Sequence, residues 1–259
     1  MLGQQIKAEF KSAVTGRQLI IWSALILAFP TIQFLLVMNN YVYYRQLEIF
    51  LRVNNGFLPI LLPLLMVLIY AVRFIGEQKN NFIPYARIRI SLKDYIGSKA
   101  IVNALYSFSA AFLMVFIPFL FIIYIEPSLG IIELYPPDSS PKVATTFEQL
   151  LPYGTITYGL IYSAWVGLNG MLYATIAFLL LQLLNNSFVA LSIPFAGYMV
   201  IVFVLQIFHL DKFSPMDSVF PFGIGQQPLW TVFIPFSALC LITTALILNV
   251  RKKLYFRYE

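Results

Sequence analysis

The side chains that could do catalytic or metal chemistry are scarce in this sequence. Among 259 residues there is one histidine, His209, and one cysteine, Cys240. A zinc site of the H-E-x-x-H kind needs two histidines, and an ATP-binding phosphate loop needs G-x-x-x-x-G-K-[ST]. The single histidine rules out the first motif. The second is absent because Gly97-Ser98-Lys99 lacks the earlier glycine. We therefore expect no enzyme activity, no catalytic residue, and no metal or cofactor bound by this chain.

Carboxylates are also missing from the interiors of the long apolar runs. A charge inside lipid is costly, so carriers that move protons keep a few such carboxylates near the membrane midplane. Here Glu126 falls at one end of an apolar run, and Arg73 falls at the end of another. The sequence therefore disfavours a proton-coupled carrier and an intramembrane hydrolase. Any energy for transport is expected to come from another chain.

One apolar run carries aromatic and amide side chains at a helical spacing. At 100° per residue they form one narrow stripe, which consists of Tyr158, Tyr162, Trp165, Asn169 and Tyr173. An adjoining face holds small side chains, namely Gly159, Ser163, Gly167, Gly170, Ala174 and Ala177. Small side chains let helices approach closely in lipid. The stripe is predicted to line a substrate path or a subunit interface, or else to form hydrogen-bonded packing within a bundle.

The elements that must position these residues are membrane-spanning helices. Hydrophobic residues make up 60% of the chain and charged residues 11%, whereas soluble domains carry roughly a quarter charged residues. A helix needs about 20 apolar residues to cross the bilayer. Six runs meet this need, at about 17–38, 57–75, 100–125, 155–183, 188–208 and 229–250. We expect an all-α integral membrane protein in which residues 1–259 form a single transmembrane domain.

The basic residues predict how these helices are oriented. By the positive-inside rule, segments rich in Lys and Arg face the cytoplasm. If the chain crosses at the six runs, 13 of its 17 Lys and Arg residues fall in 1–17, 73–99 and 251–257. We therefore expect both termini in the cytoplasm, in a multi-pass protein of the cell membrane. Because the basic residues flank apolar runs and form no separate basic domain, no nucleic-acid partner is expected.

The N-terminal residues 1–16 have an amphipathic pattern. Leu2, Ile6, Phe10 and Ala13 share one face of a helix, while the lysines of this segment lie elsewhere. This pattern predicts an amphipathic interfacial helix on the inner leaflet of the membrane. An ordinary cytoplasmic tail is the alternative. The segment has no short apolar core followed by a cleavage site, so no cleaved signal peptide is expected.

Two segments are predicted on the opposite, external side of the membrane. The external loop 126–154 contains five prolines and is expected to hold little regular structure apart from a short helix near 145–151. Residues 209–223 are too apolar for a free loop. They predict a re-entrant segment before the last span, with one or two short helices capped by Ser214 or Asp217.

The cytoplasmic loop 76–99 is long and mixes charged with apolar side chains. Its apolar members include Phe82, Ile83, Tyr85 and Ile88. A solvated linker does not need such side chains, whereas a segment that docks on a partner protein does. The loop is therefore predicted to be a docking site.

This layout resembles the permease subunits of type-2 ABC exporters. The loop also carries residues in the order typical of that family, which are Gly76-Glu77, then Pro84-Tyr85-Ala86-Arg87, then Tyr95-Ile96-Gly97-Ser98-Lys99. The sequence departs from the family at Gln78-Lys79-Asn80-Asn81, where an acidic or small-residue run ending in Gly-Thr is more usual.

The resemblance implies a dimer of permease chains, either a homodimer or a related heterodimer, in membrane lipid. Two copies of a separate ABC ATPase would bind ATP and Mg, and loop 76–99 would form the coupling helix that docks on the ATPase. The residues implied in this coupling are Glu77, Phe82, Ile83, Pro84, Tyr85 and Arg87. A stripe without buried charge fits an amphipathic cargo, such as a peptide, a lipid or a hydrophobic drug exported from a bacterium.

Two other classes of protein compete with this interpretation. A non-transporting immunity or sensor protein would bind an antimicrobial peptide directly, but it would not need an apolar docking loop in the cytoplasm. A membrane-embedded enzyme is disfavoured by the single histidine and the acid-poor spans.

Overall fold

The computed structural model describes residues 2–80, 90–136, 144–221 and 224–256. Six of its helices are long and apolar enough to cross a membrane, which confirms the predicted number of spans. Five are α2 (Gly16–Val37), α4 (Phe57–Lys79), α6 (Leu92–Leu120), α8 (Thr155–Leu183) and α9 (Ser187–Ile207). The sixth is α11 (Phe233–Phe256), which follows the 3-10 turn η4 (Leu229–Val232). Among the described residues there is no strand, only an isolated bridge between Tyr43 and Leu134.

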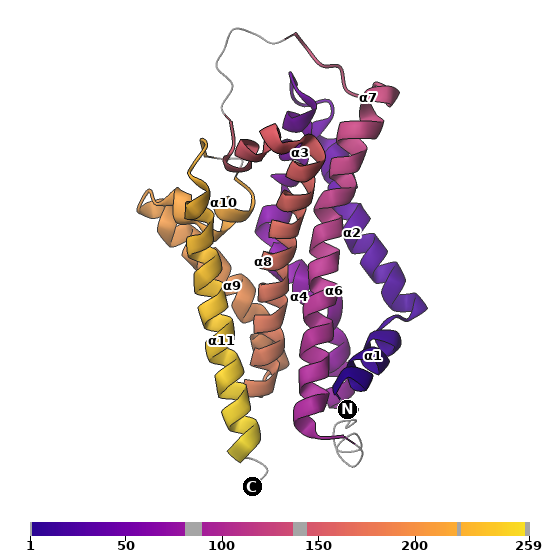
Figure 1. Ribbon diagram of the computed structural model, residues 1–259, viewed down its shortest axis with the longest axis vertical. Coiled ribbons are helices and arrows are strands. Elements are labelled where there is room, and N and C mark those ends of the chain that lie inside the picture. The colour runs from indigo at the N-terminus through magenta and orange to yellow at the C-terminus, as the bar shows by residue number, and fades with distance from the viewer. Residues whose placement is uncertain (1, 81–89, 137–143, 222–223, 257–259) are drawn as a thin grey trace.

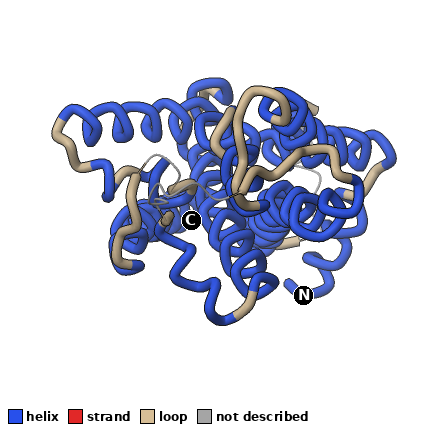
Figure 2. Tube along the Cα trace, turned by 90° about the horizontal axis from the view of Figure 1, so that it is seen from above, coloured by secondary structure: helices blue, strands red, loops and turns tan. Residues whose placement is uncertain are grey.

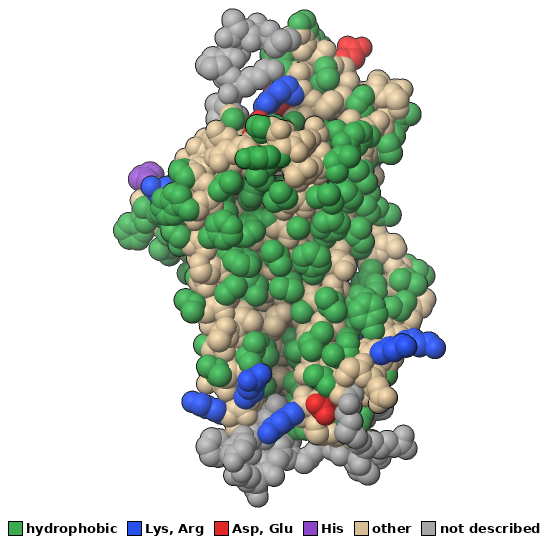
Figure 3. Space-filling model, viewed as in Figure 1, with side chains coloured by type: hydrophobic (Ala, Val, Ile, Leu, Met, Phe, Trp, Pro, Cys, Tyr) green, Lys and Arg blue, Asp and Glu red, His purple; other side chains and the backbone are tan. Residues whose placement is uncertain are grey.

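The long helices stand side by side in one bundle, and both chain termini lie at the same end of it (Figure 1). We call this end the terminal end and the opposite end the loop end. Lys and Arg side chains are seen near the terminal end in Figure 3. An even number of crossings places the termini together, as the sequence predicts. Seen down the long axis, the described chain consists of helices joined by loops (Figure 2).

Three helices extend further toward the terminal end than the apolar runs predict. α4 continues past residue 75 to Lys79, α6 begins at Leu92 rather than near residue 100, and α11 continues past residue 250 to Phe256. The added turns carry charged side chains, so span limits that are based on apolar residues alone do not include them. Ser91 caps α6, because its hydroxyl accepts a hydrogen bond from the Asp94 N–H.

At the loop end, α6 changes its hydrogen bonding after Pro118. A π-helical turn, η1 (Phe121–Ile125), follows and leads into the short helix α7 (Glu126–Leu129). Proline removes a backbone donor, and a π-turn absorbs the resulting irregularity.

Short helices lie at both ends of the bundle. α1 (Leu2–Ala13) lies at the terminal end, and α3 (Gln46–Asn54) at the loop end (Figure 1). The short helix expected near 145–151 is the 3-10 helix η2 (Thr146–Tyr153), in which Thr145 and Glu148 form a capping box. Before the last span come η3 (Asp211–Phe213) and α10 (Pro215–Val219), and Ser214 caps α10 as predicted. α3 was not predicted, although Leu47, Phe50, Leu51 and Asn54 recur at helical spacing and are buried.

α8 is the central helix of the bundle, and its small-residue face packs against α6. A side chain added at Gly159 would overlap the ring of Phe119, and a Cβ at Gly167 would come within 2.9 Å of Phe108. Without these glycines α6 and α8 could not lie so close. The predicted packing role of the small face is thus observed.

The helices differ widely in how much of their apolar surface the chain itself covers. In α8, 78% of the most apolar stretch is buried, whereas the share is 17% in α2 and 22% in α9 and in α11. The exposed side chains on these three helices are mostly apolar, as Figure 3 shows for one face. Such a surface requires lipid or another apolar partner around it.

Candidate functional site

Of the six residues implied in coupling, the structure describes Glu77 at the end of α4. The other five, Phe82, Ile83, Pro84, Tyr85 and Arg87, lie outside the described residues. The described chain stops at residue 80, one residue after α4, and resumes at residue 90 just before α6. The site is therefore built from the two helix ends that flank the loop.

Lys99 of α6 is held between two carboxylates at the terminal end. Its ammonium nitrogen lies 2.7 Å from Glu77 Oε2 and 2.9 Å from Glu9 Oε2, and its side chain is 1% exposed. A buried ammonium group is tolerated only where opposite charges and hydrogen bonds replace its water. Lys99 thus joins α1, α4 and α6 at one point.

Two tyrosine hydroxyls complete the coordination of these carboxylates. Tyr70 donates a hydrogen bond of 2.6 Å to Glu9 Oε1, and Tyr95 donates one of 2.8 Å to Glu77 Oε2. The guanidinium of Arg73 lies 3.6 Å from Glu77 Oε1. We call this set the terminal-end network; it consists of Glu9, Tyr70, Arg73, Glu77, Tyr95 and Lys99. Two bases face two acids, so the formal charges of the network sum to zero.

The last turn of α1 is fixed by further contacts with α4 and α6. Arg73 donates hydrogen bonds to the backbone carbonyl of Ser12 and, at 3.2 Å, to its hydroxyl. Tyr106 donates to the Phe10 carbonyl at 2.8 Å, and the two rings stack with centroids 4.5 Å apart. Carbonyls in the last turn of a helix have no partner within the helix, so these donors satisfy them.

α2 is joined to the same region of α4. The Gln18 amide and the Trp22 indole each donate a hydrogen bond of 2.9 Å to the Ile69 carbonyl. The Trp22 ring also lies against Tyr106, with centroids 4.5 Å apart. α1, α2, α4 and α6 therefore form one connected unit around the helix ends that flank residues 81–89.

Sequence reasoning missed the terminal-end network, although one signal was present. On the helical wheel of α1, Glu9 falls beside Leu2 and Ala13, at one edge of the apolar face. An acid in that position needs a buried cation. Its partner, Lys99, lies in the sequence at the start of a predicted span. Only the packing of three helices brings the two together.

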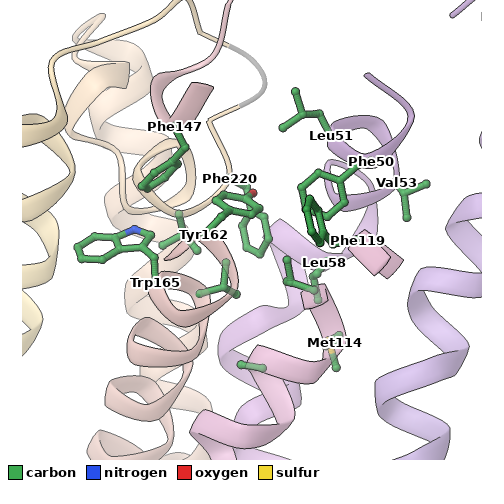
Figure 4. Packing of buried hydrophobic residues seen from close by; sticks show 14 of the residues in the cluster. Phe50, Leu51, Val53, Leu58, Met114, Phe119, Phe147, Tyr162, Trp165 and Phe220 are labelled. Atoms are coloured by element: carbon green, nitrogen blue, oxygen red, sulfur yellow. The ribbon is translucent and has the colours of Figure 1, made fainter. Parts of the chain in front are cut away.

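The aromatic stripe of α8 is buried among the chain's own elements. Exposed fractions run from 0% at Tyr158 to 7% at Trp165, with Tyr162, Asn169 and Tyr173 between them. Near Tyr162 and Trp165 lie Phe147 of η2 and Phe220, which follows α10 (Figure 4).

Hydrogen bonds and ring contacts fix the rest of the stripe. The Trp165 indole donates to the Ser218 carbonyl at 2.9 Å, and the Asn169 amide donates to the Trp165 carbonyl. Tyr173 meets Tyr198 of α9 edge to face, and the Tyr198 hydroxyl donates to the Pro59 carbonyl. This arrangement favours packing for the stripe within one chain. A substrate path or subunit interface there stays a prediction.

A second polar cluster closes the loop end of the bundle. Arg45 lies 3.0 Å from Glu48 and 3.0 Å from Glu148 of η2, and we call these three residues the loop-end network. Burial alone would lower the pKa of Arg45, but the hydrogen bonds and charges of Glu48 and Glu148 outweigh burial and raise it. Nearby, burial raises the pKa of the Tyr43 hydroxyl to about 12.

No protein-family model, no curated protein and no solved structure matches this chain.

Proposed function

We propose that this chain is the permease subunit of an ATP-driven ABC exporter in a bacterial cell membrane. In this proposal both termini lie in the cytoplasm, and α1 lies on the inner leaflet. The observation that carries the proposal is the terminal-end network, because it joins the two helices on either side of residues 81–89. A loop between helices joined in this way is suited to receive a force from a partner and pass it to the spans.

The network supports a mechanism in which the ATPase acts on the spans through the loop. Closure of the ATPase pair on ATP would press on residues 81–89, and Glu77 and Lys99 would keep α4 and α6 moving together. Since both helices pack on α8, their displacement would change the packing of the central helix. The permease would thus supply contacts that differ between an inward-open and an outward-open state.

The exposed apolar faces of three helices support the partners that the proposal names, which are lipid and a second permease chain. α2, α9 and α11 present apolar faces that either lipid or a second permease chain could cover. Because the α8 stripe is buried, passage of cargo along it would require helices of one chain to separate. A path between two permease chains would need no such separation. The cargo class proposed is amphipathic: a peptide, a lipid or a hydrophobic drug.

The proposal is tested by purifying the tagged chain from its native membrane in mild detergent. We expect an ATPase to co-purify, and we expect the variant Ile83→Asp with Tyr85→Asp to lose it. The matched control is Ile131→Asp with Leu134→Asp, which places the same charges on exposed residues of the loop end. The control should retain the ATPase.

Two outcomes would contradict the proposal. If no ATPase co-purifies with a folded chain, the immunity or sensor function becomes the better hypothesis, and peptide binding should then be measured directly. If both double variants lose the ATPase equally, residues 81–89 are not the docking site.

A further inference from the structure

A groove opens at the terminal end between α6 and α11, apart from the terminal-end network. Its volume is about 1040 Å³, at the upper end of the roughly 300–1,000 Å³ common for ligand pockets. α6, α8 and α11 supply most of its walls, and Leu2 of α1 reaches its edge.

The deeper walls of the groove are apolar. They are formed by Ile96 and Ile101 of α6, Leu179 of α8, and Ile247 and Val250 of α11. Leu179 and Val250 are each 4% exposed, so they form a closed base rather than an opening to the core. These residues belong to helices that are long and apolar enough to span the membrane. The deep part of the groove therefore faces hydrocarbon rather than water.

The rim of the groove is mostly basic. It carries Lys93, Arg251 and Lys252 together with one acid, Asp94, so the rim has a net charge of +2 from three bases and one acid. Arg251 and Lys252 are exposed. An apolar trough that ends in exposed cationic groups matches a molecule with a hydrocarbon tail and an anionic head.

The C-terminal end of α11 is held in place against α8, and this contact maintains the groove. The Lys253 ammonium donates hydrogen bonds of 2.9 Å to the Gln182 carbonyl and 3.1 Å to the Leu183 carbonyl. These carbonyls end α8, where a cation also interacts favourably with the helix dipole. α11 is thereby anchored beside α8 while its next basic neighbours, Arg251 and Lys252, remain at the rim.

We propose that this groove binds one anionic phospholipid of the membrane leaflet at the terminal end. The acyl chains lie against Ile101, Leu179 and Ile247, and the phosphate lies at Arg251 and Lys252. A second copy of this chain would fit less well. Its terminal end carries the same excess of bases, and like charges would meet across the groove. The proposal is independent of the exporter function.

The test is native mass spectrometry of the purified full-length chain with added phosphatidylglycerol or phosphatidylcholine of the same acyl chains. We expect retention of phosphatidylglycerol over phosphatidylcholine. The variant Arg251→Gln with Lys252→Gln should weaken phosphatidylglycerol binding about 30-fold, since each basic residue near an anionic lipid contributes about fivefold. Binding of phosphatidylcholine should stay unchanged.

A matched control distinguishes lipid binding in the groove from attraction of lipid by the general positive charge of this end. Lys7→Gln with Lys11→Gln removes two exposed bases from α1 and should leave phosphatidylglycerol retention within about twofold. A second variant, Ala100→Trp, fills the groove without a change in charge and should reduce retention of both lipids. Circular dichroism and size-exclusion chromatography would establish that each variant is folded.

Three outcomes would overturn the proposal. Equal retention of the two lipids would exclude a charge-selective site, and equal loss in both double Gln variants would mean that lipid binds to diffuse charge. A protein dimer that dissociates only in the groove variants would assign the groove to a second copy of the chain.

Discussion

The two ends of the bundle are each closed by an ionic network, but the two networks differ in their exposure to water. At the terminal end the Lys99 side chain is 1% exposed and the Glu9 side chain 7%. At the loop end the Arg45 side chain is 33% exposed and Glu48 25%. Each network joins segments that are distant in the sequence. The Lys99–Glu9 pair at the terminal end is closed off from solvent, while Glu77 and Arg73 at its edge are 19% and 25% exposed.

This difference in burial indicates how much free energy is lost when the ion pairs at each end are broken. Removal of one partner from a buried ion pair leaves an uncompensated charge and costs about 3–5 kcal/mol. Half-exposed pairs contribute about 0–1 kcal/mol, because water replaces the lost partner. The terminal end therefore behaves as a fixed joint, while the loop end can rearrange at low cost. In the proposed exporter, force would be received at the fixed end and opening would take place at the other.

The largest effect is expected from Lys99→Met. This change leaves Glu9 without a cation and Glu77 with Arg73 alone, and we expect the free energy of unfolding to fall by about 3–5 kcal/mol. Thermal unfolding in detergent measures the loss. The double variant Glu9→Gln with Lys99→Met leaves Glu77 paired with Arg73 and should recover much of it. If the double variant is no more stable than Lys99→Met alone, charge compensation is not what stabilises this joint.

A smaller effect, confined to high pH, is expected from Tyr43 near the loop end. Its ordinary pKa of 10.0 applies to the unfolded chain, and burial raises it to about 12 in the folded chain. The folded state keeps the proton that the unfolded state loses. Stability present below about pH 10 is therefore lost as the pH rises to about 12, by roughly 3 kcal/mol.

Tyr43→Phe isolates this contribution. The variant also loses the hydrogen bond from the Tyr43 hydroxyl to the Val37 carbonyl, which lowers stability by about 1 kcal/mol at every pH. The difference in stability between wild type and variant should shrink and reverse between about pH 10 and 12. Parallel curves over that range would contradict the assignment.

Glu9→Gln should weaken the terminal end by about 1–3 kcal/mol. Lys99 keeps Glu77 as a partner, so no charge is left wholly uncompensated, but the hold of α1 on α4 and α6 is reduced. Hydrogen exchange of the amides in 2–13 should accelerate, while exchange in α8 stays unchanged. The control is Gln5→Glu on the same helix, at a half-buried position outside the network. Equal acceleration in both variants would mean that any charge change on α1 detaches it.

The smallest effect is expected from Arg45→Gln at the loop end. Arg45 is a third exposed and Glu48 a quarter exposed, and the buried Glu148 carboxylate keeps the Thr145 N–H as a donor, so the loss should be about 1 kcal/mol. The same thermal unfolding assay measures it. A loss as large as that of Lys99→Met would remove the contrast between the two ends.

The spans could be predicted because lipid imposes a simple requirement on them. A run such as 155–183 must satisfy its backbone hydrogen bonds internally and present apolar side chains, and both are visible in the sequence. The packing of Gly167 and Gly170 against α6 was also predictable, since small residues on one face indicate a close helix contact. The number and type of the main elements thus follow from local pattern.

The candidate site could not be predicted in the same way. Glu9 and Lys99 interact across three helices, and no local pattern identifies which basic residue pairs with which acid. The role of the α8 stripe could not be predicted from the sequence either. The same Tyr162 side chain suits a path or a core, and only the positions of Phe147 and Phe220 show that it is covered within the chain.

The contact between Glu9 and Lys99 also sets an order of events during synthesis. The two residues are 90 positions apart (99 − 9), and at roughly 5–20 residues per second the ribosome takes about 5–20 seconds to pass from one to the other. Until then the contacts of α1 with α4, through Tyr70 and Arg73, lack the cation that pairs with Glu9. The third of the six long helices carries that lysine, so the first helix made is fully secured only when half of these helices exist.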